Sequence, residues 1–177
     1  MITLAAPDAR DRLLALARAG DRDALGRLLA RYHNYLGLLA RLQVRRRLQG
    51  KVDAADLVQE TFLKAHRRFA TFRGSTEREW TGWLRQILAT SAANLVRRYL
   101  GNRGRDPRLE RELADAFDSS SRCLEGGFAL PQSTPSQQAA RREQAVLLAE
   151  ALARLPEDHR EAVDAFLGKR KPEFKGR

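Results

Sequence analysis

The chain of 177 residues is predicted to be all-α, and three observations predict this class. Apolar side chains recur at helical spacing through most of the sequence, whereas the alternation typical of strands is nearly absent. Capping residues stand at the borders of the periodic stretches. The hydrophobic content of 43% permits a real core, and no apolar run approaches the ~20 residues that span a bilayer. We expect a helical bundle, followed by a linker and a short C-terminal helical remnant.

The first two predicted helices are separated by a Gly-Asp pair. The stretch "PDARDRLLALARAG" stops at Gly20, a residue typical of a helix C-terminus. Asp21 is a suitable N-cap for the next stretch, "RDALGRLLARYHNYLGLLARLQVRRRL", in which leucine and tyrosine recur at helical spacing. Gly50 ends this second segment, which the pattern predicts as one continuous helix.

Two further helices follow in the first hundred residues. Asp53 is placed to cap a helix over 53–69. Thr76 and Glu79 have the spacing of a capping box, which predicts a helix from about 76 to 100. The predicted core stripe of this last helix consists of Trp80, Leu84, Ile87, Leu88, Ser91 and Leu95.

The sequence changes character after this point. Residues 102–135 are rich in Ser, Gly and Pro and have no sustained period, so we predict a flexible acidic linker with at most one weak helical turn in "LERELADAF". A last helical stretch leads to Pro156, and "EDHREAVDAFLG" predicts a short following helix. The predicted units are a helical domain over 1–101, the linker over 102–135 and the C-terminal remnant over 136–177.

The composition excludes several classes of function. A single cysteine and three scattered histidines leave no disulfide framework and no zinc cluster. We find no glycine-rich phosphate loop and no Ser/His/Asp grouping, so we expect neither an enzyme nor a bound metal or cofactor. "MITLAAPDARDR" does not read as a signal peptide. These features favour a cytoplasmic protein without a membrane segment.

The charge favours a polyanionic partner. The net charge is +11, and the pI is near 10.9. The stretch 24–52 carries seven basic residues and no acidic one, and 80–105 carries five basic residues and no acidic one. Between 106 and 137 there are six acids against three arginines. The first ~100 residues therefore form a basic unit, followed by an acidic segment.

The helix over 53–69 has an acidic face. Its core stripe would be Ala54, Val58, Phe62, Ala65 and Phe69, and the opposite side carries Asp53, Asp56, Glu60, Lys64 and Arg67. Leu57 and Leu63 lie off the core stripe, one on each side of the acidic strip. Either the helix is buried on more than one side, or this acidic face with its two leucines docks onto a basic protein surface.

The helix over 76–100 is the candidate nucleic-acid element. Trp80, Trp83 and Tyr99 accompany Arg85, Arg97 and Arg98. Aromatic rings can stack on unpaired bases, and arginines can neutralise phosphates. The alternative is that both tryptophans belong to the core.

The pattern "AGDRDALGRLLARY … DAADLVQETFLKAHRRFATFRG … WLRQIL … LVRR … LARLPEDHREAV" resembles the extracytoplasmic-function sigma factors of bacterial RNA polymerase. The resemblance covers about residues 10–101 strongly and about 145–163 moderately. It implies a sigma region-two domain that binds the β′ clamp helices of core RNA polymerase and opens the promoter −10 element. It also implies a linker that runs toward the RNA exit path. An anti-sigma factor is a further partner that the resemblance leaves open.

The resemblance assigns roles to particular residues. The polymerase-binding residues would be Asp53, Asp56, Leu57, Gln59, Glu60 and Leu63. The promoter-binding residues would be Phe72, Arg73, Gly74, Ser75 and Thr76, in the loop that holds a flipped base, with Arg85, Asn94, Arg97 and Arg98 along the DNA. Relatives often have Asn where this chain has Thr90, and Asp where it has Asn94.

The end of the chain departs from the family. "LARLPEDHREAV" resembles the opening helix of a C-terminal helix-turn-helix domain, and about 40 further residues with the recognition helix would be needed to read the −35 element. We therefore expect a sigma factor that acts at the −10 element. The alternatives are a decoy that occupies the sigma site of the polymerase and a basic helical nucleic-acid-binding protein with no polymerase partner.

Overall fold

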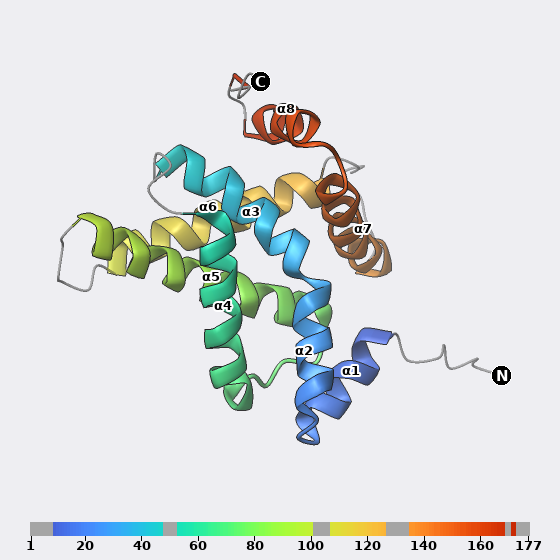
Figure 1. Cartoon of the computed structure of the whole chain (residues 1–177). Helices are drawn as coiled ribbons and strands as arrows, with labels where there is room; N and C mark the ends of the chain where they lie inside the picture. Colours follow the sequence, from blue (N-terminus) through green and yellow to red (C-terminus); the bar gives the residue numbers. More distant parts are fainter. Residues whose placement is uncertain (1–8, 48–52, 101–106, 127–134, 169–170, 173–177) are drawn as a thin grey trace.

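The computed structural model describes residues 9–47, 53–100, 107–126, 135–168 and 171–172, and these form helices joined by turns, with no strand among them (Figure 1). This confirms the predicted all-α class. The helices are α1 Ala9–Arg18, α2 Arg22–Arg31, α3 His33–Arg47, α4 Ala54–Arg68, α5 Glu77–Leu100, α6 Pro107–Gly126, α7 Pro135–Ala153 and α8 Glu157–Leu167, with a 3₁₀ turn η1 over Phe69–Thr71. No helix in the described ranges is long and apolar enough to cross a membrane.

The helix borders follow the predicted capping residues. Gly20 has a φ of 99°, the left-handed conformation that a side chain would disfavour. The Asp21 carboxylate accepts a hydrogen bond of 2.9 Å from the amide of Ala24, and Asp53 accepts one of 2.9 Å from the amide of Ala55. These two carboxylates satisfy backbone donors that each helix leaves free at its N-terminus.

The predicted capping box opens α5. The backbone amide of Thr76 donates to Glu79 Oε2 at 2.9 Å, and the amide of Glu79 donates back to Thr76 Oγ1 at 3.2 Å. This reciprocal pair is the arrangement that the spacing predicts. The predicted core stripe of α5 is also confirmed, since all six of its residues are buried.

The second predicted helix is interrupted at Tyr32. Its amide bonds to the carbonyl of Leu29 at 3.0 Å, and its φ and ψ of −100° and 4° separate α2 from α3. The Tyr32 ring is fully buried, and its hydroxyl donates to Glu77 of α5 at 3.0 Å. The break thus coincides with a tertiary contact that helical periodicity does not report.

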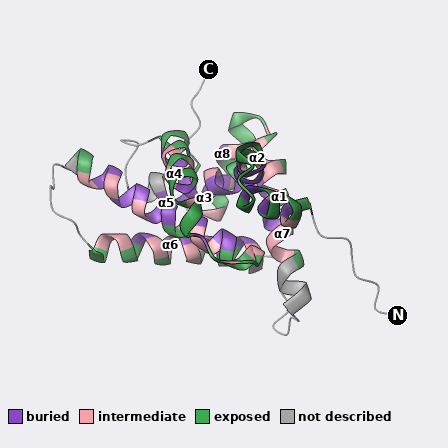
Figure 2. Ribbon diagram, turned by 90° about the horizontal axis from the view of Figure 1, so that it is seen from below, coloured by how far each residue is buried: buried purple, intermediate pink, exposed green. Residues whose placement is uncertain are grey.

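Helix α6 corrects the prediction of a flexible linker over 102–135, because residues 107–126 form a packed helix. Figure 2 shows α6 running alongside α5, with buried residues repeated along its length. Leu113, Phe117 and Leu124 are buried in the common core, and Ser121 shares a hydrogen bond of 2.8 Å with the buried hydroxyl of Tyr35. The apolar residues recur at helical spacing, but the many Ser and acidic residues between them obscured the pattern.

Helices α7 and α8 pack against α3. Helix α7 contributes Ala145, Val146 and Ala149 to the core. The Arg41 guanidinium of α3 bonds to the buried Asp164 carboxylate of α8 at 2.7 Å. The short helix predicted after Pro156 is present, and it lies on α3 as well as following α7.

Candidate interaction surfaces

The exposed side of α4 carries the predicted acidic face. Asp53, Asp56 and Gln59 are exposed. Glu60 is half-buried and forms an ion pair with Lys64 one turn later, with 2.8 Å between Glu60 Oε1 and Lys64 Nζ. The surface therefore presents carboxylates and an amide along about two turns of helix, with one carboxylate already partly neutralised.

The prediction that Leu57 edges this surface is wrong. Its side chain is 0% exposed, and Thr61, one turn later, is also buried and donates its hydroxyl to the Leu57 carbonyl at 2.7 Å. Helix α4 packs against both α3 and α5, so its buried arc is wider than one stripe. The arc is also turned toward Leu57, since Phe62 and Phe69, predicted for the core, are only half-buried.

Leu63, in contrast, is exposed as predicted. Its side chain is 54% exposed and lines an apolar groove of about 370 Å³ between α4 and the α2–α3 junction. The groove is also lined by Leu29, Ala30, His33, Gln59 and Phe62. The rings of His33 and Phe62 lie 5.8 Å apart across it. The sequence pattern did not reveal the residues from α2 and α3, because only folding brings them beside α4.

The loop before α5 is closely packed and hydrogen-bonded to its neighbours. A Cβ on Gly74 would lie 2.6 Å from the Glu79 Cβ and 2.7 Å from the Phe72 ring, so only glycine fits there. Glu79 Oε2 accepts hydrogen bonds from the amides of Ser75 and Thr76, each at 2.9 Å. The bonds from Thr76 and then Ser75 hold the pKa of the Glu79 carboxyl below its usual range. Arg18 of α1 donates to the Gly74 carbonyl from the other side.

The residues of the predicted base-holding loop differ in how far they are exposed. Arg73, Ser75 and Thr76 are exposed, and Gly74 is half-buried. Phe72 is only 7% exposed, because its ring packs against Trp80 and Trp83, with 5.1 Å between centroids in each case. The expectation that Phe72 is free to contact DNA is therefore corrected: it supports the loop from beneath.

The two tryptophans also belong mainly to the interior. Trp80 is buried, in agreement with the core alternative, and Trp83 is half-buried against it, with centroids 5.2 Å apart. Tyr99, near the end of α5, is exposed. Of the three aromatic residues singled out in the sequence, Tyr99 alone offers a largely free ring.

Arg85 is held within the fold. Its guanidinium bonds to Asp118 of α6 at 2.6 Å and to the hydroxyl of Tyr35 at 3.2 Å, and its side chain is 15% exposed. These contacts contradict its prediction as a free DNA-facing arginine. The reason is again α6, which brings an acidic side chain onto the face of α5 that the sequence left basic.

The end of α5 keeps its basic character. Arg98 is exposed, and Arg97 is half-buried and donates to the Asn94 side chain. Thr90 is engaged by α6, since its hydroxyl bonds to Glu110 at 2.6 Å. The candidate promoter-binding residues thus fall into two exposed groups, the loop 73–76 and the last turn of α5. In the described part of the chain, no cluster of His, Cys, Asp or Glu could hold a metal ion.

Comparison of the sequence with known proteins shows the family to which the chain belongs. Residues 31–105 match the Sigma-70 region 2 family. The chain is 32% identical to the ECF RNA polymerase sigma-E factor of Haemophilus influenzae over 152 residues, which are 85% of this chain and 72% of that protein. It is 30% identical to the RNA polymerase sigma-H factor of Pseudomonas aeruginosa, over 86% of this chain and 72% of that protein. No solved structure matches. The chain belongs to the extracytoplasmic-function family of RNA polymerase sigma factors, which act in transcription initiation.

Proposed function

We propose that the chain binds core RNA polymerase through the exposed face of α4 and promoter −10 DNA through the loop 73–76 and the end of α5. The observation that carries the proposal is the separation of the two surfaces: an acidic strip beside an apolar groove on α4, and exposed arginines around the loop before α5 and at its end. An acidic strip would be repelled by DNA, so the two surfaces suit different partners.

The polymerase surface combines two kinds of contact. Asp56, Gln59 and Asp53 would meet basic and polar groups of the β′ clamp helices, and Leu63 would enter their apolar side. The groove beside Leu63 supports this assignment, because central apolar anchors supply most of the free energy of protein–protein binding, while exposed charges mainly guide association. Leu57 is not part of this proposed surface.

The DNA surface is proposed from backbone order and exposed charge. The loop 73–76 is braced by Glu79 on one side and Arg18 on the other, so little conformational entropy is lost when it holds an unstacked base. Arg98 and Tyr99 at the end of α5 are exposed and suit a phosphate and a base or sugar. Arg73, within the loop itself, adds a second exposed cation.

The alternatives are not favoured. A basic nucleic-acid-binding protein without a polymerase partner does not fit the match to Sigma-70 region 2. A decoy would share the polymerase surface and differ only in its inability to start transcription. We also propose an anti-sigma factor as a partner that would compete for these same surfaces. The proposed location is the cytoplasm, where RNA polymerase acts.

The experiment compares two exposed leucines. Leu63→Asp and Leu147→Asp make the same change, and both leucines are 54% exposed, but Leu147 lies on α7. We expect Leu63→Asp to weaken binding to purified core polymerase by about tenfold or more, with Leu147→Asp close to the parent chain. Equal affinities for all three chains would remove α4 as the polymerase surface.

A second measurement separates a sigma factor from a decoy. The parent chain with core polymerase is tested for transcript formation on a template that carries only a −10 element. Transcripts that require the chain support the proposed function. Tight binding to the polymerase without transcripts would favour the decoy.

A further inference from the structure

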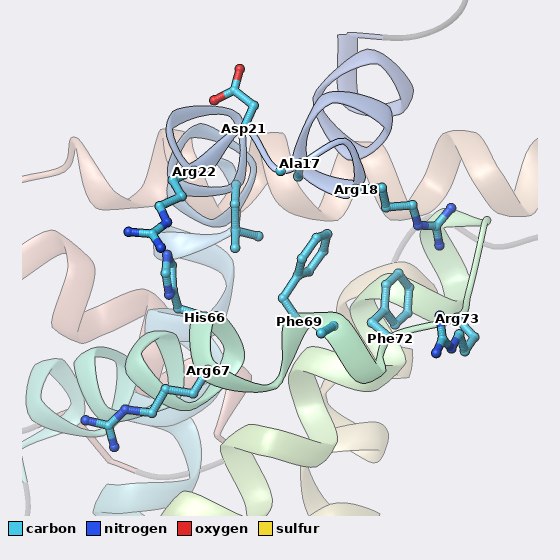
Figure 3. A pocket seen from close by; sticks show the side chains of 12 residues that line it. Ala17, Arg18, Asp21, Arg22, His66, Arg67, Phe69, Phe72 and Arg73 are labelled. Atoms are coloured by element: carbon cyan, nitrogen blue, oxygen red, sulfur yellow. The ribbon is translucent and has the colours of Figure 1, made fainter.

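A cavity of about 620 Å³ lies between the α1–α2 turn, the end of α4 and the first residues of the loop before α5 (Figure 3). Its floor is apolar and consists of Ala17, Leu25, Phe69, Ala70 and Phe72. Cavities that hold small molecules in proteins have this size and this kind of floor, with a few polar groups at the rim. The volume is far larger than a single small anion needs.

The rim of the cavity is strongly basic. Four arginines line it, Arg18, Arg22, Arg67 and Arg73, together with His66. The one acidic residue that lines it is Asp21, whose carboxylate caps α2 through Ala24. Four positive charges against one negative charge leave a formal excess of three, with the histidine counted as neutral.

The arginines of the rim have no ion-pair partner in the part of the chain that the structure describes. Arg22, Arg67 and Arg73 are exposed and form no ion pair within the described residues. Some arginines elsewhere in the fold are paired instead, as Arg41 is with Asp164 and Arg85 with Asp118. Concentrated positive charge beside a low-dielectric floor raises the local potential and attracts anions.

The aromatic floor is held in place. Phe69 is fixed against Trp80, with ring centroids 6.1 Å apart at 79°, and Figure 3 shows its ring between Arg22 with His66 on one side and Arg18 with Phe72 on the other. Arg18 lies 5.7 Å from the Phe72 ring. A flat apolar group can therefore lie against a fixed ring while cations remain within reach on both sides.

We propose that this cavity binds a free nucleotide with two or three phosphates, its base against Phe69 and its phosphates toward Arg22. A nucleotide within a DNA strand has the same base chemistry but carries a single negative charge on its phosphodiester, whereas a free di- or triphosphate gathers several charges on one nucleotide. A free polyphosphate matches the excess of three positive charges, which is why the proposal commits to it. The inference goes beyond the proposed function, which shares Arg73 with this rim but assigns no ligand to the cavity.

The test is calorimetric titration of the full chain, without polymerase or promoter, using four probes: ATP, tripolyphosphate, adenosine and a single-stranded decanucleotide. We expect saturable binding of ATP, weaker binding of tripolyphosphate and little binding of adenosine. Arg22→Ala should weaken ATP binding by about tenfold, as for the loss of one charge-assisted hydrogen bond. Arg111→Ala on α6 is the matched control, because it removes the same charge from an exposed position away from the cavity, and it should change the affinity less than twofold.

Phe69→Leu tests the base contact. It should weaken ATP but leave tripolyphosphate unchanged, with circular dichroism reporting whether the helices persist. Equal affinity for ATP and tripolyphosphate, or equal losses in Arg22→Ala and Arg111→Ala, would overturn the proposal. Failure of ATP to bind would also overturn it, whether or not the decanucleotide binds, because the loop 73–76 and the end of α5 are already proposed to bind DNA. Because no polymerase is present, none of these results bears on the α4 surface.

Discussion

The two leucines that the sequence placed on either side of the acidic strip should behave in opposite ways when each is changed to alanine. Leu57 is 0% exposed on α4, a helix that packs against both α3 and α5, so truncation leaves a cavity in a packed core. Leu→Ala changes at such sites cost 2–5 kcal/mol, and we expect about 3 kcal/mol in the free energy of unfolding. The Thr61 hydroxyl bonds to the Leu57 backbone carbonyl, so that bond survives and does not add to the cost.

Leu63→Ala should cost far less stability, because its side chain is 54% exposed and loses little buried area. Surface substitutions of this kind usually stay within about 0.5 kcal/mol. Its effect should appear in polymerase binding, where truncation of an apolar anchor costs roughly 1–2 kcal/mol. Urea denaturation followed by circular dichroism measures the first quantity, and fluorescence anisotropy with core polymerase measures the second.

The affinity comparison is made at a temperature at which both variants are folded, so that lost stability is not read as lost binding. A Leu57→Ala variant that loses less than about 1 kcal/mol of stability but binds polymerase poorly would refute the buried placement of Leu57. It would support the sequence pattern instead, in which both leucines edge the docking face.

Three further predictions concern the loop before α5 and the end of that helix. Gly74→Ala should destabilise the loop and lower the thermal midpoint, because a Cβ there would lie 2.6 Å from the Glu79 Cβ; an unchanged midpoint would show that the loop yields. The lowered pKa of Glu79 means that its bonds to the Thr76 and Ser75 amides stabilise the fold above the ordinary carboxyl pKa of 4.5, and that this contribution is lost as the pH falls through the folded-state pKa. The stability difference between the parent chain and Glu79→Gln should therefore shrink as the pH falls below 4.5 in acid unfolding scans. A difference that stays constant with pH would contradict a stabilising role for the ionised Glu79 carboxylate. Replacing Arg97 and Arg98 with Ala should weaken binding to forked −10 DNA and reduce the salt slope by about one to two phosphate contacts, whereas an unchanged slope would place both arginines away from the DNA.

Local signals in the sequence predicted the helix borders well. A cap depends on two or three neighbouring residues, so Asp21, Asp53 and the Thr76–Glu79 pair could be recognised without knowledge of the fold. The core stripe of α5 could also be predicted from the sequence, because the same face of this helix stays buried along most of its length.

The errors share a different cause. Leu57 was assigned to an exposed edge from its angle on the helix, whereas Arg85 and Phe72 were assigned to the DNA surface from the family resemblance. Their burial depends on which element packs beside them: α3 and α5 at Leu57, α6 at Arg85, and the α5 tryptophans at Phe72. Helical spacing gives the direction of a side chain but not the neighbour it meets.

The packing of α6 also changes how the charge segregation should be understood. The sequence divides into a basic first half and an acidic middle, yet acids from the later helices neutralise arginines of the earlier ones. Arg85 pairs with Asp118 at 2.6 Å, Arg41 with Asp164 at 2.7 Å and Arg31 with Glu143 at 3.2 Å.

Each of these pairs removes a cation from the surface available to a polyanion. The arginines that stay exposed without an ion pair among the described residues include Arg22, Arg67 and Arg73, around the cavity, and Arg98 at the end of α5. The number of phosphates that the described helices can contact is therefore smaller than the net charge of +11 would suggest. Because salt dependence reports contacted phosphates and not net charge, DNA binding should have a shallow slope set by the few exposed arginines near the loop and the end of α5.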